Sequence, residues 1–162
     1  MIINYKKIKN DAETPTRGSE YSAGLDLYAC LEGESIDIPS GATVKIGTGI
    51  CAEIPNGFFG AVFARSGIAT KRGLRPANCV GVIDSDYRGE LIVALHNDSN
   101  KTETIKNGDR VAQIVIMPYL PVELNEVTEL TETVRGEGGF GSTGVSHECE
   151  YEQLSLFDLM EK

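Results

Sequence analysis

Short runs in which apolar and polar residues alternate recur along most of the chain. A period of two is typical of β-strands with one buried face. The longest run covers 44–54 and stops at the turn signal Pro55-Asn-Gly57. Weaker runs predict further strands at 2–8, 25–30, 36–38, 58–63, 110–117 and 120–127.

Helical signals are rare by comparison. Only the run after Ser66, which reads Gly-Ile-Ala-Thr-Lys-Arg and stops at Gly73, has the composition of a helical turn. Residues 11–22 read as a polar loop and 97–101 as a turn. Many short strands with almost no helix and no internal repeat predict one all-β domain, a sandwich or a barrel. This pattern alone does not separate a jelly-roll barrel from an immunoglobulin-like sandwich.

One strand pair carries unusual chemistry at its turn. Apolar residues of 80–83 lead into Asp84-Ser-Asp86, and an alternating run at 91–95 leaves it, which predicts a β-hairpin. Two carboxylates and Tyr87 crowd this reversal, and Gly81 and Gly89 beside it allow a close approach by another molecule. Because Asp and Ser also form ordinary turns, a purely structural hairpin is the alternative.

Four other segments accompany this hairpin in a fixed order. Together, the five resemble the ordered motifs of the trimeric dUTP diphosphatase (dUTPase) family: Ala23-Gly-Leu-Asp-Leu27, Arg65-Ser-Gly67, the hairpin at 78–90, Gly108-Asp-Arg-Val-Ala-Gln113 and the glycine-rich 135–144. The resemblance covers about residues 1–144. It implies a jelly-roll-like barrel that forms a homotrimer with shared active sites, divided here into a barrel at 1–134, a glycine-rich active-site arm at 135–144 and an acidic tail at 145–162.

The implied activity is Mg²⁺-dependent hydrolysis of dUTP to dUMP and pyrophosphate. This reaction limits uracil in DNA and supplies dUMP for thymidylate synthesis. By resemblance Asp84 is the general base that activates water, and Asp26 holds waters on Mg²⁺. Alternation with Leu25 and Leu27 places Asp26 on the opposite strand face, where we expect it to face solvent. Asp86 we interpret as a turn or hydrogen-bonding residue.

Selectivity for the nucleoside is expected from the hairpin. By resemblance Tyr87 lies against the deoxyribose and leaves no space for a 2′-hydroxyl. Asn78 and the backbone near Gly81 and Val82 pair with the uracil edge. Cytosine is refused because its donors and acceptors are reversed, which leaves buried polar groups unpaired.

Phosphate contacts are implied for the 65–67 motif and for two later residues: Arg65, Ser66, Gly67, Gln113 and Arg135. The guanidinium fork suits phosphate oxygens. The family usually has a proline where this chain has Ala64, which loosens the backbone slightly. Arg110 stays open between a phosphate contact and an ion pair with Asp109.

The glycine-rich arm matches the dinucleotide pattern GxGxxG formally. No strand and helix unit with a downstream acid follows it, and the lysine of a Walker loop is missing. We expect instead a segment that orders over a ligand and excludes water, a disordered linker being the alternative. By resemblance Phe140 stacks on uracil, and Gly141, Ser142 and Thr143 close over the phosphates.

Composition narrows the other possibilities. The net charge of −9 argues against nonspecific binding to nucleic acid or anionic membranes. Without an apolar signal segment or a spanning run, we expect a cytoplasmic protein. The four cysteines form no CxxC pair, so we expect reduced thiols and no zinc site, and we interpret His96 and His147 as structural or solvated.

The tail beyond 144 is acidic and ends in a short apolar sequence. Five residues there resemble the peptide by which bacterial replication and repair proteins bind the sliding clamp: Gln153, Leu154, Ser155, Leu156 and Phe157. The alternative is an amphipathic turn that folds back on the trimer.

Two other functions compete with dUTP hydrolysis. One is a dCTP deaminase, or a bifunctional deaminase and dUTPase, on the same barrel. The other is a nucleotide-binding regulatory module that acts through protein partners. Asp84 together with the Phe140 arm favours the hydrolase over both.

Overall fold

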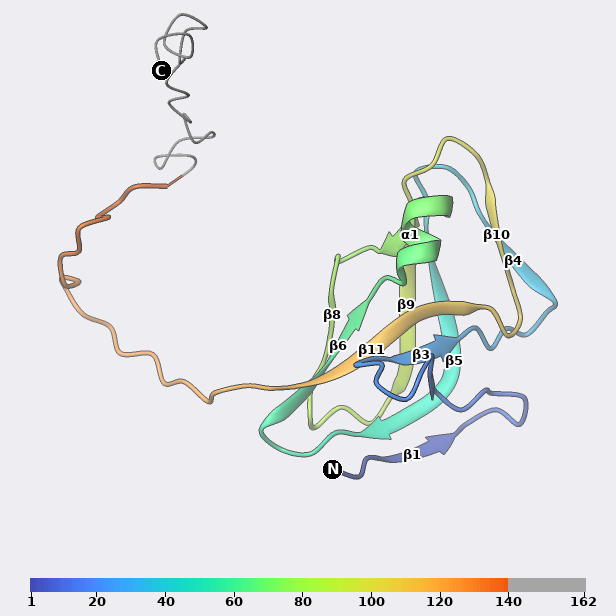
Figure 1. The fold of residues 1–162 in the computed structure, drawn as a ribbon, viewed down its shortest axis with the longest axis horizontal. Helices are drawn as coiled ribbons and strands as arrows, with labels where there is room; N and C mark the ends of the chain where they lie inside the picture. The colour runs from blue at the N-terminus through green and yellow to red at the C-terminus, as the bar shows by residue number, and fades with distance from the viewer. Residues whose placement is uncertain (140–162) are drawn as a thin grey trace, which may run out of the picture. The chain divides into compact units, whose positions relative to one another are not determined.

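The computed structural model describes residues 1–139. Two units divide the chain, Met1–Val122 and Glu123–Lys162. All the secondary structure lies in the first unit (Figure 1), within the part of the chain that the structure describes. The predicted domain boundaries at 134/135 and 144/145 stay predictions.

Eleven strands and one helix build the first unit. In chain order they are β1 (Asn4–Lys7), β2 (Thr16–Arg17), β3 (Leu25–Tyr28), β4 (Ser35–Ile38), β5 (Thr43–Glu53), β6 (Phe58–Phe63), α1 (Ser66–Arg72), β7 (Leu74–Pro76), β8 (Gly81–Ile83), β9 (Glu90–Asn97), β10 (Glu103–Lys106) and β11 (Arg110–Pro118).

The strands form three antiparallel sheets. A five-stranded sheet has the order β2-β3-β11-β6-β8, a four-stranded sheet β1-β5-β9-β7, and β10 pairs with β4. The core holds side chains from all three sheets, and Leu27, Leu95, Ile105 and Val111 are fully buried in it. Alternation in the sequence sets this core, since every second residue of β9 from Leu91 is buried. The predicted all-β class is confirmed.

The helix α1 is where the sequence predicts one. Gly73 ends it in the left-handed conformation at φ +65°, and its N-H donates to the carbonyl of Ala69. Lys71 and Arg72 lie in the last turn, where cations favour the helix dipole.

The predicted β-hairpin around Asp84 is wrong. β8 pairs with β6 in the five-stranded sheet, whereas β9 pairs with β5 and β7 in the four-stranded sheet. The segment between them, residues 84–89, is a connection between two sheets, and we call it the β8–β9 loop. Alternation identified both strands correctly, but it contains no information on which strand each one pairs with.

The predicted strand at 120–127 is also wrong, because no strand follows Pro118 within residues 1–139. Leu120 and Leu124 are almost fully exposed. A strand needs a neighbour for its backbone hydrogen bonds, and alternation alone does not supply one. Conversely, the short strands β2, β7 and β10 were missed, since two to four residues are too few to show a period.

Three of the cysteines lie within the described residues, and the predicted reduced state stays a prediction. Cys30, Cys51 and Cys79 are free thiols, and the first two are buried. In residues 1–139, no helix has the length and apolar character required to cross a membrane.

Candidate active site

A charged cluster gathers at one end of the five-stranded sheet. Asp26 of β3 lies opposite Gln113 of β11, and Gln113 lies opposite Phe63 at the end of β6. Arg65 follows Phe63 by two residues, so sheet register brings three of the predicted site residues together. We call Asp26, Arg65, Arg110 and Gln113 the Asp26 cluster.

Two arginines engage the carboxylate of Asp26. Arg65 Nε lies 2.7 Å from Oδ1, and Arg110 Nη1 lies 3.3 Å from Oδ2. Asp26 itself is only 7% exposed, so the prediction that it faces solvent is wrong. The side chains of Arg65 and Arg110 cover Asp26. The alternation within β3 does not reveal this, because both arginines come from other parts of the chain.

Arg110 does not pair with its neighbour in sequence. Asp109 accepts instead from the backbone N-H of Lys106, at 3.0 Å. β11 begins at Arg110 and pairs with β3, so Arg110 reaches Asp26 on the adjacent strand, whereas Asp109 lies in the turn before β11.

Gln113 closes the cluster against the chain before α1. Its Nε2 donates to the carbonyl of Ala64 at 3.0 Å, which fixes the backbone next to Arg65. A Cβ at Gly24 would lie 2.8 Å from Gln113 Oε1, so a larger residue there would displace the Gln113 side chain. The chain therefore holds Arg65 in place although Ala64 is not a proline. Ser66 and Gly67 begin α1 immediately after it, and both are exposed.

The β8–β9 loop presents its functional groups to solvent. Asp84 is exposed and Tyr87 is 43% exposed. The N-H of Tyr87 donates to the carbonyl of Asp84 at 3.2 Å, and Arg88 donates to the carbonyls of Ser85 and Tyr87. These bonds hold the loop in one shape while both carboxylates stay accessible.

A cavity of about 890 Å³ opens beside this loop. Its lining combines the two carboxylates with apolar and aromatic side chains: Asn56, Phe59, Val82, Asp84, Ser85, Asp86 and Tyr119. Asp86 therefore shares a cavity with Asp84, although we interpreted it as a turn residue.

The segment before β8 contains a constrained turn. Cys79 has φ +62°, its N-H donates to the carbonyl of Pro76, and the N-H of Val80 donates to the carbonyl of Asn78 at 2.7 Å. Gly81 then passes close to β6, where an added Cβ would lie 3.1 Å from that of Val62. Asn78 is exposed on this turn, next to the strand that carries Gly81 and Val82.

Sequence reasoning missed Arg75 as a support of this turn. Its Nη1 donates to the carbonyls of Pro76 and Ala77 at 3.3 and 3.4 Å. Asp98 anchors the guanidinium, with Oδ2 at 2.6 Å from Nε, and this hydrogen bond raises the pKa of Arg75. No signal in the sequence marks it, because Arg75 and Asp98 are brought together only by the β7–β9 pairing.

Asp26 and the β8–β9 loop belong to strands that are not neighbours in the five-stranded sheet. β11 and β6 lie between β3 and β8, so Asp26 lies three strand spacings of ~4.8 Å from β8 along the sheet. The structure thus places Asp26, Arg65 and Gln113 together, and Asn78, Gly81, Val82, Asp84 and Tyr87 together. Within residues 1–139, no hydrogen bond or ion pair joins a residue of one set to a residue of the other, although Arg65 follows β6, which pairs with β8.

The remaining predicted site residues lie in the second unit. Arg135 is exposed, and its Nε donates to the carbonyl of Gly138 at 2.8 Å. Phe140, Gly141, Ser142, Thr143 and the tail with its Gln153–Phe157 sequence lie outside the described residues.

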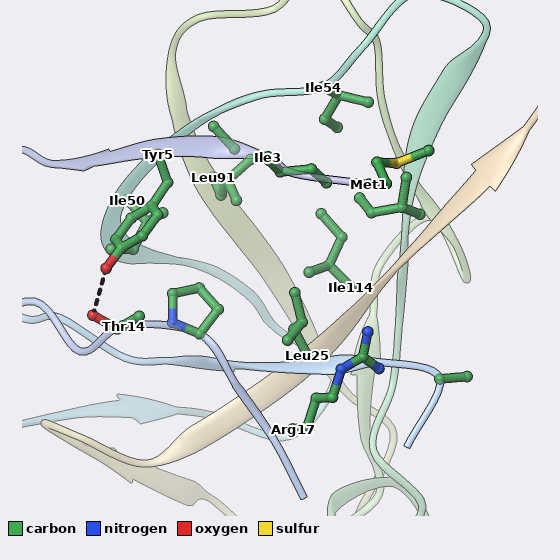
Figure 2. A pocket seen from close by; sticks show the side chains of 14 residues that line it. Met1, Ile3, Tyr5, Thr14, Arg17, Leu25, Ile50, Ile54, Leu91 and Ile114 are labelled. Carbon is green, nitrogen blue, oxygen red and sulfur yellow. Dashed lines mark hydrogen bonds between the residues drawn. The ribbon is translucent and has the colours of Figure 1, made fainter. Parts of the chain in front are cut away.

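Another pocket, of about 470 Å³, contains none of the predicted site residues (Figure 2). Apolar side chains from β3, β5 and β11 line it, among them Leu25, Ile50 and Ile114. At its edge Tyr5 and Thr14 share a hydrogen bond of 3.1 Å. Its lining is mainly apolar, and none of the predicted catalytic or phosphate-binding residues belongs to it.

Comparison with known proteins identifies the family. The family model for dUTPase matches residues 10–144. This chain belongs to the dUTPase family. A deoxyuridine 5′-triphosphate nucleotidohydrolase of Desulfitobacterium hafniense (strain DSM 10664 / DCB-2) is 48% identical over 89% of this chain and 95% of its own. Another, from Paramecium bursaria Chlorella virus 1, is 43% identical over 86% of this chain and 96% of its own.

Solved dUTPases also share the fold. The dUTPase of Staphylococcus bacteriophage 80alpha, a mutant studied with dUpNHpp, superposes with a TM-score of 0.80 at 27% identity. The match covers 89% of this chain and 99% of the phage chain. The predicted family, enzyme class and jelly-roll-like fold are thus confirmed, and an immunoglobulin-like sandwich is not favoured.

The residues present fit a magnesium ion that is bound chiefly by its ligand. Within residues 1–139, no group of three or more His, Cys, Asp or Glu side chains forms a metal cage. Mg²⁺ keeps several waters and binds through one or two carboxylates plus substrate phosphates. Asp26 suits this role, because its two arginine contacts leave acceptor sites on a carboxylate that has about four.

Proposed function

We propose that this dUTPase-family protein hydrolyses dUTP to dUMP and pyrophosphate in the cytoplasm. The observation that carries the proposal is the exposed Asp84 beside Tyr87, in a loop whose internal hydrogen bonds fix its shape. The 80alpha enzyme, of the same fold, has been studied with dUpNHpp, a nonhydrolysable dUTP analogue.

Each group of the loop has a role in this reaction. Asp84 accepts a proton from the water that attacks the α-phosphorus, the new P–O bond forms, and pyrophosphate leaves as its bond to phosphorus breaks. Tyr87 lies against the deoxyribose. Asn78 and the main chain at Gly81 and Val82 read the uracil edge.

The phosphates interact with the other set of residues. Arg65, Ser66, Gly67 and Gln113 bind phosphate oxygens, and Asp26 prevents the repulsion that two close guanidinium groups would otherwise have. Arg135 and the arm residues Phe140, Gly141, Ser142 and Thr143 cover the bound nucleotide. The family depends on Mg²⁺, which when bound neutralises phosphate charge, and Asp26 would hold it through water.

We further propose that the active site is assembled between copies of the chain in a homotrimer. Two observations support this: two strands lie between β3 and β8, and no hydrogen bond or ion pair within residues 1–139 joins the Asp26 cluster to the β8–β9 loop, whereas one nucleotide needs both sets of residues. In a shared site, the Asp26 cluster of one copy faces the β8–β9 loop of another.

Complementation tests the shared site directly. Asp84→Asn and Arg65→Ala variants, each inactive alone, are unfolded, mixed and refolded together, with separately refolded variants as the control. Hybrid trimers with shared sites regain part of the activity, because some sites then receive both intact halves. If every site lay within one chain, no mixture would be active.

One assay tests the activity and its rivals. The protein is given dUTP, dCTP or TTP with Mg²⁺, and both pyrophosphate and ammonia are measured. We expect pyrophosphate from dUTP alone. Ammonia from dCTP would indicate a deaminase or a bifunctional enzyme, and nucleotide binding without turnover would indicate a regulatory module.

The acidic tail adds a separate proposal. The sequence at 153–157 supports binding to the hydrophobic groove of a bacterial sliding clamp, which would bring the enzyme to sites of DNA synthesis. Deleting 153–157 should abolish capture by an immobilised clamp while dUTP hydrolysis is retained. Equal capture of the full chain and the deletion variant, or no capture of either, would reject binding to the clamp through 153–157 and favour the tail folding back on the trimer.

A further inference from the structure

Glu90, the first residue of β9, joins the β8–β9 loop to an irregular part of β5. The register between β5 and β9 changes between the pairs Gly47 with Ile92 and Cys51 with Glu90. In this bulge Gly49 has φ +67°, and its backbone N-H donates to Glu90 Oε1 at 2.7 Å. The extra residues of β5 have no partner on β9, and the Glu90 side chain accepts the hydrogen bond of the Gly49 N-H in place of a β9 carbonyl.

The bulge is shaped to hold this carboxylate. A Cβ at Gly47 would lie 2.7 Å from Glu90 Oε1, so the carboxylate lies directly against the Gly47 backbone. Beside it, the buried hydroxyl of Thr48 donates to the carbonyl of Leu91 at 2.7 Å. Glu90 is therefore fixed at both its side chain and its neighbouring backbone.

Glu90 also contacts Tyr87. The Tyr87 hydroxyl donates to the backbone carbonyl of Glu90 at 3.0 Å. The ring passes over Gly89, where a Cβ would lie 2.4 Å from the Tyr87 hydroxyl oxygen. Glu90 and Tyr87 line one small cavity of about 140 Å³ together with Asp84 and Val82.

We infer that Glu90 is a positioning residue for Tyr87, and that its anchor in the β5 bulge sets how strongly the enzyme prefers deoxyribose to ribose. The inference rests on the proposed function, in which Tyr87 lies against the sugar. A phenol excludes a 2′-hydroxyl only if it cannot move away by an ångström or so. The Tyr87 hydroxyl is bound to the backbone carbonyl of Glu90. That carbonyl is held in place because the Glu90 side chain is bound to Gly49 in the β5 bulge.

Substitutions at position 90 separate this role from a general structural one. Glu90→Ala removes the acceptor for the Gly49 N-H, whereas Glu90→Gln keeps an oxygen there. Glu53→Ala is the matched control, because Glu53 also links β5 to the loop, through an exposed pair with Arg88 at 3.6 Å, whereas the Tyr87 hydroxyl is bound to Glu90. Tyr87→Phe removes the hydroxyl that Glu90 holds.

The measurement is kcat/KM for dUTP divided by that for UTP. For Glu90→Ala we expect the ratio to fall about 5- to 10-fold, mainly through a lower KM for UTP, because a hydrogen bond to a charged acceptor is lost. Glu90→Gln should stay within about 2-fold of wild type. Tyr87→Phe should lower the ratio similarly, and the double variant should lower it little further, because both changes act on one contact.

Other results would overturn the inference. These are an unchanged ratio in Glu90→Ala with only a lower melting temperature, an equal fall in Glu53→Ala, or full additivity with Tyr87→Phe. If Glu90→Ala does not fold, Glu90→Asp replaces it with the same expectations, because the shorter side chain withdraws its carboxylate from Gly49.

Binding measurements distinguish this inference from the proposed function. Calorimetry with α,β-imido-dUTP and α,β-imido-UTP gives the same ratio without turnover. A wild-type protein that prefers the deoxy analogue but does not hydrolyse dUTP would reject the proposed function, and loss of that preference in Glu90→Ala would still support the role of Glu90. A wild type without preference would reject the inference.

Discussion

The Asp26 cluster and the β8–β9 loop use acidic side chains in opposite ways. In the cluster the carboxylate is buried and contacts two arginines, at 2.7 and 3.3 Å. In the loop Asp84 and Asp86 are exposed and line an open cavity, and the loop is held by backbone acceptors. A paired carboxylate orders the residues around it, whereas an exposed one stays available to accept a proton. We therefore expect the cluster to contribute to stability and binding, and the loop to contribute chemistry.

Substitution of Asp84 should show the largest effect on chemistry. Asp84→Asn is expected to lower kcat for dUTP by about 10²- to 10⁴-fold, because an amide does not accept the proton of the attacking water. Urea unfolding should be nearly unchanged, and calorimetry should still detect α,β-imido-dUTP. Asp86→Asn is the matched control, with turnover close to wild type. Normal turnover in Asp84→Asn would remove Asp84 as the base.

Substitution of Asp26 should mainly lower the free energy of unfolding. Asp26→Asn leaves Arg65 and Arg110 beside a neutral group, and we expect a loss of about 1–3 kcal/mol in the free energy of unfolding. Urea denaturation measures it. Asp37→Asn serves as control, because Asp37 is exposed and accepts a hydrogen bond from the hydroxyl of Thr104, a neutral donor. If Asp26→Asn proves as stable as Asp37→Asn, the cluster does not order the fold.

A substitution in the turn before β8 should raise the free energy of unfolding, by a smaller amount. Cys79 holds φ +62°, a conformation that costs a side chain about 1–2 kcal/mol and glycine almost nothing. Cys79→Gly should therefore raise the free energy of unfolding by about 0.5–1 kcal/mol after the added chain entropy of glycine. Cys79→Ala keeps the strain and should give no gain. A thermal melt compares the three proteins, and equal melting temperatures would contradict the expectation.

Glu103, which lies outside both regions, should make the stability of the protein depend on pH. Arg72 donates to Glu103 at 2.6 Å, and this hydrogen bond holds the pKa of Glu103 below its ordinary value of 4.5. A lowered folded-state pKa contributes stability above pH 4.5, and that contribution is lost as the pH falls through the folded-state value. Between pH 7 and pH 3, the free energy of unfolding should decline less steeply in Glu103→Gln than in wild type. Parallel curves would contradict this assignment.

The sequence alone predicts several local features of this protein. The alternation in β5 and β9 and the glycine stop of α1 predicted where these elements lie, because periodicity and backbone conformation depend on neighbouring residues. The motif residues likewise predicted a set of site residues, of which the structure brings Asp26, Arg65 and Gln113 together. What failed was pairing: the Asp84 turn was interpreted as a hairpin, and 120–127 as a strand.

The chain therefore specifies by its own pattern where strands form, which residues face the core and which family it belongs to. Only the tertiary structure decided that β8 and β9 enter different sheets, that Asp26 is buried under Arg65 and Arg110, and that Glu90 holds Tyr87 through a bulge in β5. The reason is physical. Periodicity reports on one strand's own faces, whereas a sheet partner, an ion pair between strands and a bulge contact each join residues that are far apart in sequence.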